Sequence, residues 1–163
     1  MLGAIWAEFD LSAGIWTVPG ARMKGGEDHV LYLSPRAREI LEGQRAVGQP
    51  FVFPAPALDG RPLSNMAMLM LLRRFGIASA TTVHGLCRST FSTWANETGA
   101  ARPGVIEACL AHREGDKIRA AHNRAQFVGE RRKLLEAWAA YLGGQEPTSN
   151  VMASVIRVTE AAA

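Results

Sequence analysis

Residues 82–127 read TVHGLCRSTFSTWANETGAARPGVIEACLAHREGDKIRAAHNRAQF and hold three of the four histidines of this 163-residue chain. His84 lies four residues before Arg88, and His112 lies ten residues before His122. Arginine binds phosphate oxygens through paired hydrogen bonds, and histidine can donate to an oxyanion or carry a proton. This stretch is therefore the first candidate for a functional site.

The composition is that of an ordinary folded chain, with 48% hydrophobic and 20% charged residues. No apolar run approaches the roughly 20 residues that a membrane helix needs, and the first ten residues lack the pattern of a signal peptide. The two cysteines, Cys87 and Cys109, are too few for a disulfide framework and form no CxxC zinc pattern. We therefore expect a cytoplasmic protein with no membrane partner.

The net charge is +3 and the isoelectric point is near 9.2. An excess of positive charge favours binding to polyanions, of which DNA is the commonest. Seven basic residues gather in about twenty positions: Arg113, Lys117, Arg119, Arg124, Arg131, Arg132 and Lys133. A solvated helix face and a DNA-binding face both explain this cluster, and the first is the commoner case.

The N-terminal part predicts an antiparallel hairpin. Two apolar runs, 15–19 and 29–33, flank a glycine-containing loop over 20–28, and Lys24 lies on that loop. Residues 9–13 read as a turn.

Helices account for most of the rest. Ser34 and Pro35 are a typical N-cap and first helical residue, and the helix that follows should extend to about Gln44. Its expected buried residues are Ala37, Ile40 and Leu41. Ser64 is expected to cap a second helix, to about Phe75, which is apolar on nearly all sides and should therefore be a central buried helix.

Further helices are expected over 84–97, capped by Thr81 or Thr82, and from Pro103 onward. Two more are expected over 117–127 and 130–142. The expected fold is mainly α with a small antiparallel β-sheet near the N-terminus, in the α+β class.

Three runs resemble the catalytic domain of tyrosine recombinases, and in particular phage and genomic-island integrases: TVHGLCRSTFSTWANETG (82–99), VIEACLAH (105–112) and KIRAAHNRAQFVGERRKLLEAWAAYL (117–142). The segments WAEFDLSAGIWTVPGARMK (6–24) and HVLYLS (29–34) resemble the first β-sheet of that family. The resemblance implies a tyrosine-recombinase catalytic-domain-like fold over residues 1–144, followed by a C-terminal tail over 145–163.

The resemblance also implies a reaction. In that family a tyrosine hydroxyl attacks a phosphate of double-stranded DNA and forms a covalent 3′-phosphotyrosyl link, with no metal or nucleotide cofactor. By position, Lys24 matches the lysine that protonates the leaving oxygen. His84 and Arg88 match the histidine and second arginine, and His112 matches the second histidine, which orients phosphate oxygens. His122 stands at the nucleophile position, because this chain reads AAHNR where the family reads AAYNR.

Two further departures accompany His122. The family spacing HxxR is HxxxR here, and one extra residue rotates Arg88 by about 100° on an ideal α-helix. The family's first arginine and its N-terminal core-binding domain would precede Met1, so the chain reads as N-terminally truncated. We therefore expect a site-specific recombinase or integrase domain, for DNA integration by a mobile element, with impaired strand cleavage.

Two alternatives remain open. One is a non-enzymatic DNA-binding or regulatory module derived from an integrase, with a basic face from Arg113 to Lys133 and the tail docked on another integrase protomer. The DNA contacts expected of this chain, with or without catalysis, are Arg113, Lys117, Arg119 and Arg124. The other is a metal site built from His84, His112 and His122.

Overall fold

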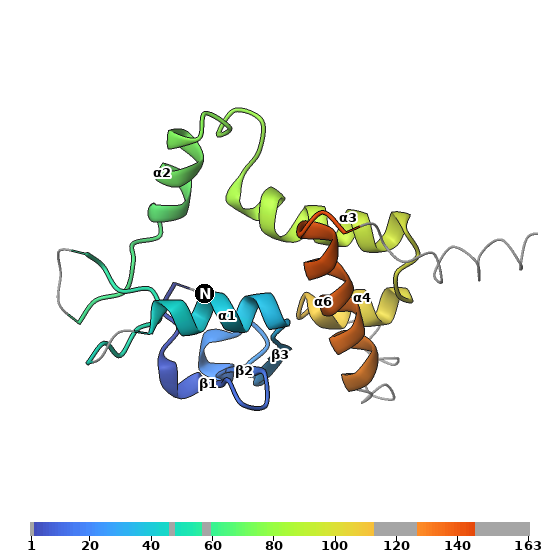
Figure 1. Ribbon diagram of the computed structural model, residues 1–163, viewed down its shortest axis with the longest axis horizontal. Coiled ribbons are helices and arrows are strands. Elements are labelled where there is room, and N and C mark those ends of the chain that lie inside the picture. The colour runs from blue at the N-terminus through green and yellow to red at the C-terminus, as the bar shows by residue number, and fades with distance from the viewer. Residues whose placement is uncertain (1, 46–47, 57–59, 113–126, 146–163) are drawn as a thin grey trace, which may run out of the picture. The chain divides into compact units, whose positions relative to one another are not determined.

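The structure is a computed structural model that describes residues 2–45, 48–56, 60–112 and 127–145. The chain divides into two compact units, Met1–Cys87 and Arg88–Ala163. In their described parts, the first unit holds a three-stranded antiparallel sheet with two α-helices, and the second unit holds helices (Figure 1). The α+β class expected from the sequence is therefore confirmed.

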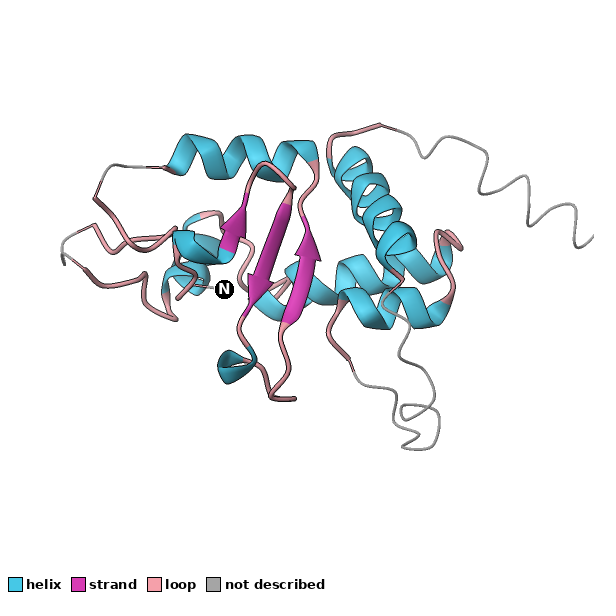
Figure 2. Ribbon diagram, turned by 90° about the horizontal axis from the view of Figure 1, so that it is seen from below, coloured by secondary structure: helices cyan, strands magenta, loops and turns pink. Residues whose placement is uncertain are grey.

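The sheet has the order β1-β2-β3 and is antiparallel throughout (Figure 2). Its strands are β1 (Phe9–Asp10), β2 (Ile15–Val18) and β3 (His29–Tyr32). The expected hairpin is β2 and β3, in a register that pairs Val18 with His29. Strand β1 lies where a turn was expected, because two residues are too few to show alternation in the sequence.

Helix α1 (Pro35–Gln44) begins as its sequence predicts. The backbone N–H of Ala37 donates to Oγ of Ser34, 3.2 Å away, and Pro35 is the first helical residue. Leu41 is buried as expected, whereas Ile40 is 49% exposed, so that expectation was wrong. Ile40 precedes Leu41 by one residue and therefore lies about 100° around the helix from it.

The core of the first unit lies between α1, the sheet and the segment around Val52. Ala4, Leu41 and Val52 are buried at its centre. Partly buried side chains pack around them: Trp6, Phe9, Leu11, Trp16, Leu33 and Phe53.

Helix α2 (Ala67–Arg74) is not the buried helix that its composition predicted. Leu72 is its buried residue, while Met70 and Leu71 are 44% and 41% exposed. A helix that is apolar on all sides needs neighbours on all sides, and the described part of this unit does not supply them. At the start of this helix the N–H of Ala67 donates to the carbonyl of Ser64 at 3.0 Å. No side-chain hydrogen bond from the described residues caps the helix, so the expected Ser64 cap was wrong.

The second unit is built on α3 (Thr90–Glu97), α4 (Pro103–Cys109) and α6 (Val128–Leu142), which pack against one another. Among the described residues of this unit, seven buried residues form the core: Phe91, Trp94, Ala95, Val105, Ile106, Cys109 and Leu134. Trp138 and Tyr141 extend this core, with ring centroids 5.0 and 5.5 Å from that of Trp94. The helix expected over 117–127 lies almost wholly outside the described residues. No described helix is long and apolar enough to cross a membrane.

Arg131 corrects the expectation of a basic solvent face. It is 5% exposed and lies in α6 one turn before the buried Leu134, so it faces the core. Arg132 and Lys133 are exposed. Of the described residues of the basic cluster, Arg131 therefore lies in the core, and Arg132 and Lys133 lie on the surface.

Candidate functional site

Arg88 lies in a π-helix, Gly85–Ser89, which continues directly into α3. A π-turn closes i→i+5 hydrogen bonds and so holds one residue more than an α-turn. The three residues between His84 and Arg88, where the sequence reads HxxxR, lie in this π-turn. The helix that follows, α3, keeps Phe91 and Trp94 buried.

His84 lies in the first turn of the same helical segment. The N–H of Gly85 donates to Oγ1 of Thr82 at 2.9 Å, so Thr82 is the side-chain cap that was expected at Thr81 or Thr82. The His84 side chain is exposed.

His112 follows the C-terminal end of α4. Ala111 has a φ of 56°, in the left-handed region, and the N–H of His112 donates to the carbonyl of Glu107 at 3.0 Å. This is the Schellman pattern, in which the chain turns back on the helix that it leaves. Because Ala111 is not glycine, the turn costs conformational energy, which is a common property of functional sites.

Arg88 and His112 meet at this helix end. Nη2 of Arg88 donates to the carbonyl oxygen of Leu110 at 2.8 Å and lies 2.5 Å from Nε2 of His112. Nδ1 of His112 lies 2.6 Å from Oε2 of Glu107. The three side chains therefore form a chain of contacts in the second unit, running from Glu107 through His112 to Arg88.

The site is accessible. The His112 side chain is 49% exposed and Arg88 is half-buried. A guanidinium beside an imidazole can bind an oxyanion, because the guanidinium donates hydrogen bonds to it and the imidazole also donates once Nε2 carries a proton.

Glu107 was not among the residues picked from the sequence. Its signal is an acidic residue five positions before a histidine at a helix end, in VIEACLAH. The left-handed turn at Ala111 brings that histidine back beside the acid, and such a turn is hard to foresee without a glycine.

Lys24 lies on the β2–β3 loop, as expected, and is exposed. The loop is held at its base, where the N–H of Gly20 donates to Oδ1 of Asp28 at 2.8 Å. A Cβ at Gly20 would lie 2.4 Å from the carbonyl oxygen of Gly26, so the two sides of the loop approach too closely for any other residue at position 20.

A buried carboxylate also braces this loop. Glu8 accepts hydrogen bonds from Nη2 of Arg22 and, at 3.0 Å, from Nε1 of Trp16. Nη1 of Arg22 donates to the carbonyl of Gly3 at 2.7 Å. Arg22 is therefore a structural arginine that ties the loop to the N-terminal segment.

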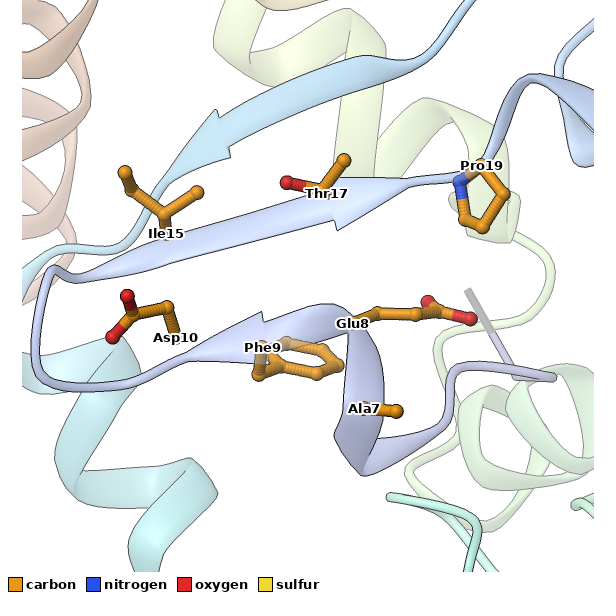
Figure 3. A pocket seen from close by; sticks show the side chains of 7 residues that line it. All are labelled: Ala7, Glu8, Phe9, Asp10, Ile15, Thr17 and Pro19. Atoms are coloured by element: carbon orange, nitrogen blue, oxygen red, sulfur yellow. The ribbon is translucent and has the colours of Figure 1, made fainter.

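A hollow of about 370 Å³ lies along β1 and β2 (Figure 3). It is lined by Ala7, Glu8, Phe9, Asp10, Ile15, Thr17 and Pro19. None of the candidate residues that the structure describes, Lys24, His84, Arg88 and His112, lines it.

The remaining candidates lie outside the described residues: His122, Arg113, Lys117, Arg119 and Arg124. No hydrogen bond or ion pair joins Lys24 to His84 in the described part of the first unit. Among the described residues, no group of three His, Cys, Asp or Glu residues could hold a metal ion. The metal alternative needs His122 and stays a hypothesis.

Comparison with known proteins gives the same family as the sequence motifs. The chain is 35% identical over 157 residues to prophage integrase IntA of Escherichia coli (strain K12), and this match covers 95% of the chain. The chain belongs to the phage integrase family. It is also 39% identical over 136 residues, or 82% of this chain, to prophage integrase IntZ of the same organism. It is 31% identical over 140 residues, or 84% of this chain, to the integrase of Shigella phage Sf6.

This integrase-family chain spans 38% of the length of IntA, 33% of IntZ and 36% of the Sf6 integrase. No family model matches the chain. No solved structure matches it either.

Proposed function

We propose that this chain is the catalytic region of a tyrosine recombinase of the integrase type, which binds double-stranded DNA through a scissile phosphate. The observation that carries the proposal is the contact between Arg88 and His112 at the end of α4. Two separate motifs of the integrase pattern, HGLCR and LAH, supply these side chains, and the family relationship to prophage integrases supports the assignment.

Each proposed role follows from the chemistry of the side chain. The Arg88 fork binds phosphate oxygens, and His112 orients them. Lys24, on its braced loop, donates a proton to the leaving oxygen, and His84 adds a further donor. Arg113, Lys117, Arg119 and Arg124 contribute phosphate contacts along the duplex.

Strand cleavage is the impaired step in this proposal. His122 stands where the integrase pattern has its tyrosine, and an imidazole has no hydroxyl to form a phosphotyrosine ester. The chain would therefore bind DNA without forming the covalent link on which rejoining depends.

His122→Tyr tests the assignment of the nucleophile position. The variant is grafted into IntA in place of the matching 157 residues and incubated with a pool of nicked suicide duplexes of randomised sequence. We expect a covalent protein–DNA product that survives denaturing electrophoresis from the His122→Tyr graft and none from the His122 graft. A covalent product from the His122 graft, or none from either graft, would contradict the assignment.

The second candidate function is a non-enzymatic DNA-binding or regulatory module derived from an integrase. His122 favours it, because loss of the nucleophile leaves DNA binding as the remaining activity. Docking of residues 145–163 on another integrase protomer would belong to this role. A gel-shift titration tests it: binding at low salt that weakens as salt rises is expected, and no binding at low salt would exclude it.

A further inference from the structure

The ring of His112 is held on both sides. Nδ1 lies 2.6 Å from Oε2 of Glu107, and Nε2 lies 2.5 Å from Nη2 of Arg88. No role in the integrase pattern described above is assigned to Glu107, so its place beside His112 calls for an explanation.

The partners fix which nitrogen carries the proton. A guanidinium has donors only, so Nε2 of His112 must accept from Arg88. A neutral imidazole has one N–H, and it must then lie on Nδ1. A carboxylate accepts, so this N–H donates to Glu107.

Glu107 also holds the backbone of the same histidine. Its carbonyl accepts the N–H of His112 at 3.0 Å, across the left-handed turn at Ala111. One residue of α4 thus fixes both the main chain and the ring of His112. Rotation of the ring about its side-chain bonds would break the contact between Nδ1 and the carboxylate.

We propose that Glu107 is a positioning residue for His112. It directs Nε2 toward Arg88 and, in the proposed function on which this inference rests, toward the DNA phosphate. When Nε2 donates to a phosphate oxygen, the ring takes up one proton from solvent at Nε2 and becomes an imidazolium. The Glu107 carboxylate then balances the positive charge of the ring, as carboxylates do for histidines in other sites.

Glu107→Gln and Glu107→Ala separate positioning from charge. The Gln side chain keeps an oxygen that can accept from Nδ1–H, whereas Ala removes the acceptor. Glu97→Ala is the matched control, because Glu97 is an exposed acidic residue at the end of α3.

The first measurement uses no DNA. In ¹⁵N-labelled wild-type protein at neutral pH, the His112 ring should show a protonated Nδ1 and an unprotonated Nε2. If Arg88 alone sets this tautomer, Glu107→Ala leaves it unchanged. We expect instead that Glu107→Ala shows a mixture of both tautomers, while Glu107→Gln and Glu97→Ala keep the wild-type signals. An unchanged tautomer in Glu107→Ala would overturn the inference.

The second measurement is binding of a 20-base-pair duplex. We expect Glu107→Ala to weaken binding about fivefold, roughly the effect of losing one ordinary hydrogen bond, and Glu107→Gln to lose less. Equal affinity for Glu107→Ala and wild type would overturn the role toward phosphate. If no form binds DNA while the tautomer result holds, the proposed function fails and the positioning of the ring by Glu107 stands.

Discussion

Nη2 of Arg88 donates both to the carbonyl oxygen of Leu110 and to Nε2 of His112, although Arg88 and His112 are 24 residues apart in the sequence. The guanidinium thereby closes the C-terminal end of α4, where the last carbonyls of a helix have no partner within the helix. The same side chain is a structural brace and a candidate phosphate ligand.

Arg88→Ala should therefore lower the free energy of unfolding even without DNA. We expect a loss of about 1 kcal/mol, because a charge-assisted hydrogen bond is removed from a half-exposed site. Urea denaturation measures it. Arg36→Ala is the control, since Arg36 makes an exposed ion pair with Glu39, and its effect should be near zero. Equal effects of the two substitutions would show that Arg88 has no bracing role.

Ala111→Gly should stabilise the chain. Ala111 has a φ of 56°, where glycine escapes the cost that a Cβ incurs. The expected gain is about 0.5–1 kcal/mol in thermal or urea unfolding, after the greater freedom of glycine in the unfolded chain is subtracted. Ala108→Gly, within α4, should instead lose about 1 kcal/mol. A loss in both variants would contradict the strained turn before His112.

The two cysteines should differ sharply in reactivity. Cys87 is exposed, whereas Cys109 is buried in the core of the second unit. Burial raises the pKa of the Cys109 thiol, and the nearby Arg131 offsets part of that rise. Because the thiolate is the reactive form, a thiol reagent at pH 8 should label Cys87 quickly and Cys109 only after unfolding. Cys87→Ser should abolish the fast phase, and fast labelling that survives it would show that Cys109 is open to solvent.

Asp10 should contribute a pH-dependent share of stability. Hydrogen bonds from Ser12 Oγ and the N–H of Ala13 lower the pKa of its carboxyl below the ordinary 3.8. A lowered folded-state pKa gives stability that is present above the unfolded-state value and lost as pH falls through the folded-state value. Asp10→Ala should thus be less stable than wild type at pH 7, and the gap should narrow as the pH falls through the lowered folded-state pKa of Asp10. A gap that persists unchanged at pH 2 would contradict this account.

Local signals in the sequence predicted the local structure well. Ser34 with Pro35 fixed the start of α1, and Gly76 and Gly99, both with positive φ, follow the ends of α2 and α3. Burial was less predictable, as Ile40 and the exposed face of α2 show, because it depends on which neighbours surround a helix rather than on the helix itself.

The candidate site was only partly predictable. Arg88 and His112 were assigned through a resemblance, and spacing alone could not bring together side chains so far apart in the sequence. Glu107 was missed, since its role depends on a left-handed alanine that no local rule predicts. The π-helix that contains Arg88 was also unexpected, because the HxxxR spacing was read on an ideal α-helix.

The most direct test of the central claim, that Arg88 and His112 hold a DNA phosphate, is the salt dependence of duplex binding. Fluorescence anisotropy with a labelled duplex gives log K against log of salt concentration for wild type, for Arg88→Ala with His112→Ala, and for Arg36→Ala. The account predicts weaker binding by the double variant and a salt slope shallower by about 1, the value for one lost phosphate contact, with Arg36→Ala like wild type. Equal affinity and equal slope for the double variant and wild type would contradict it.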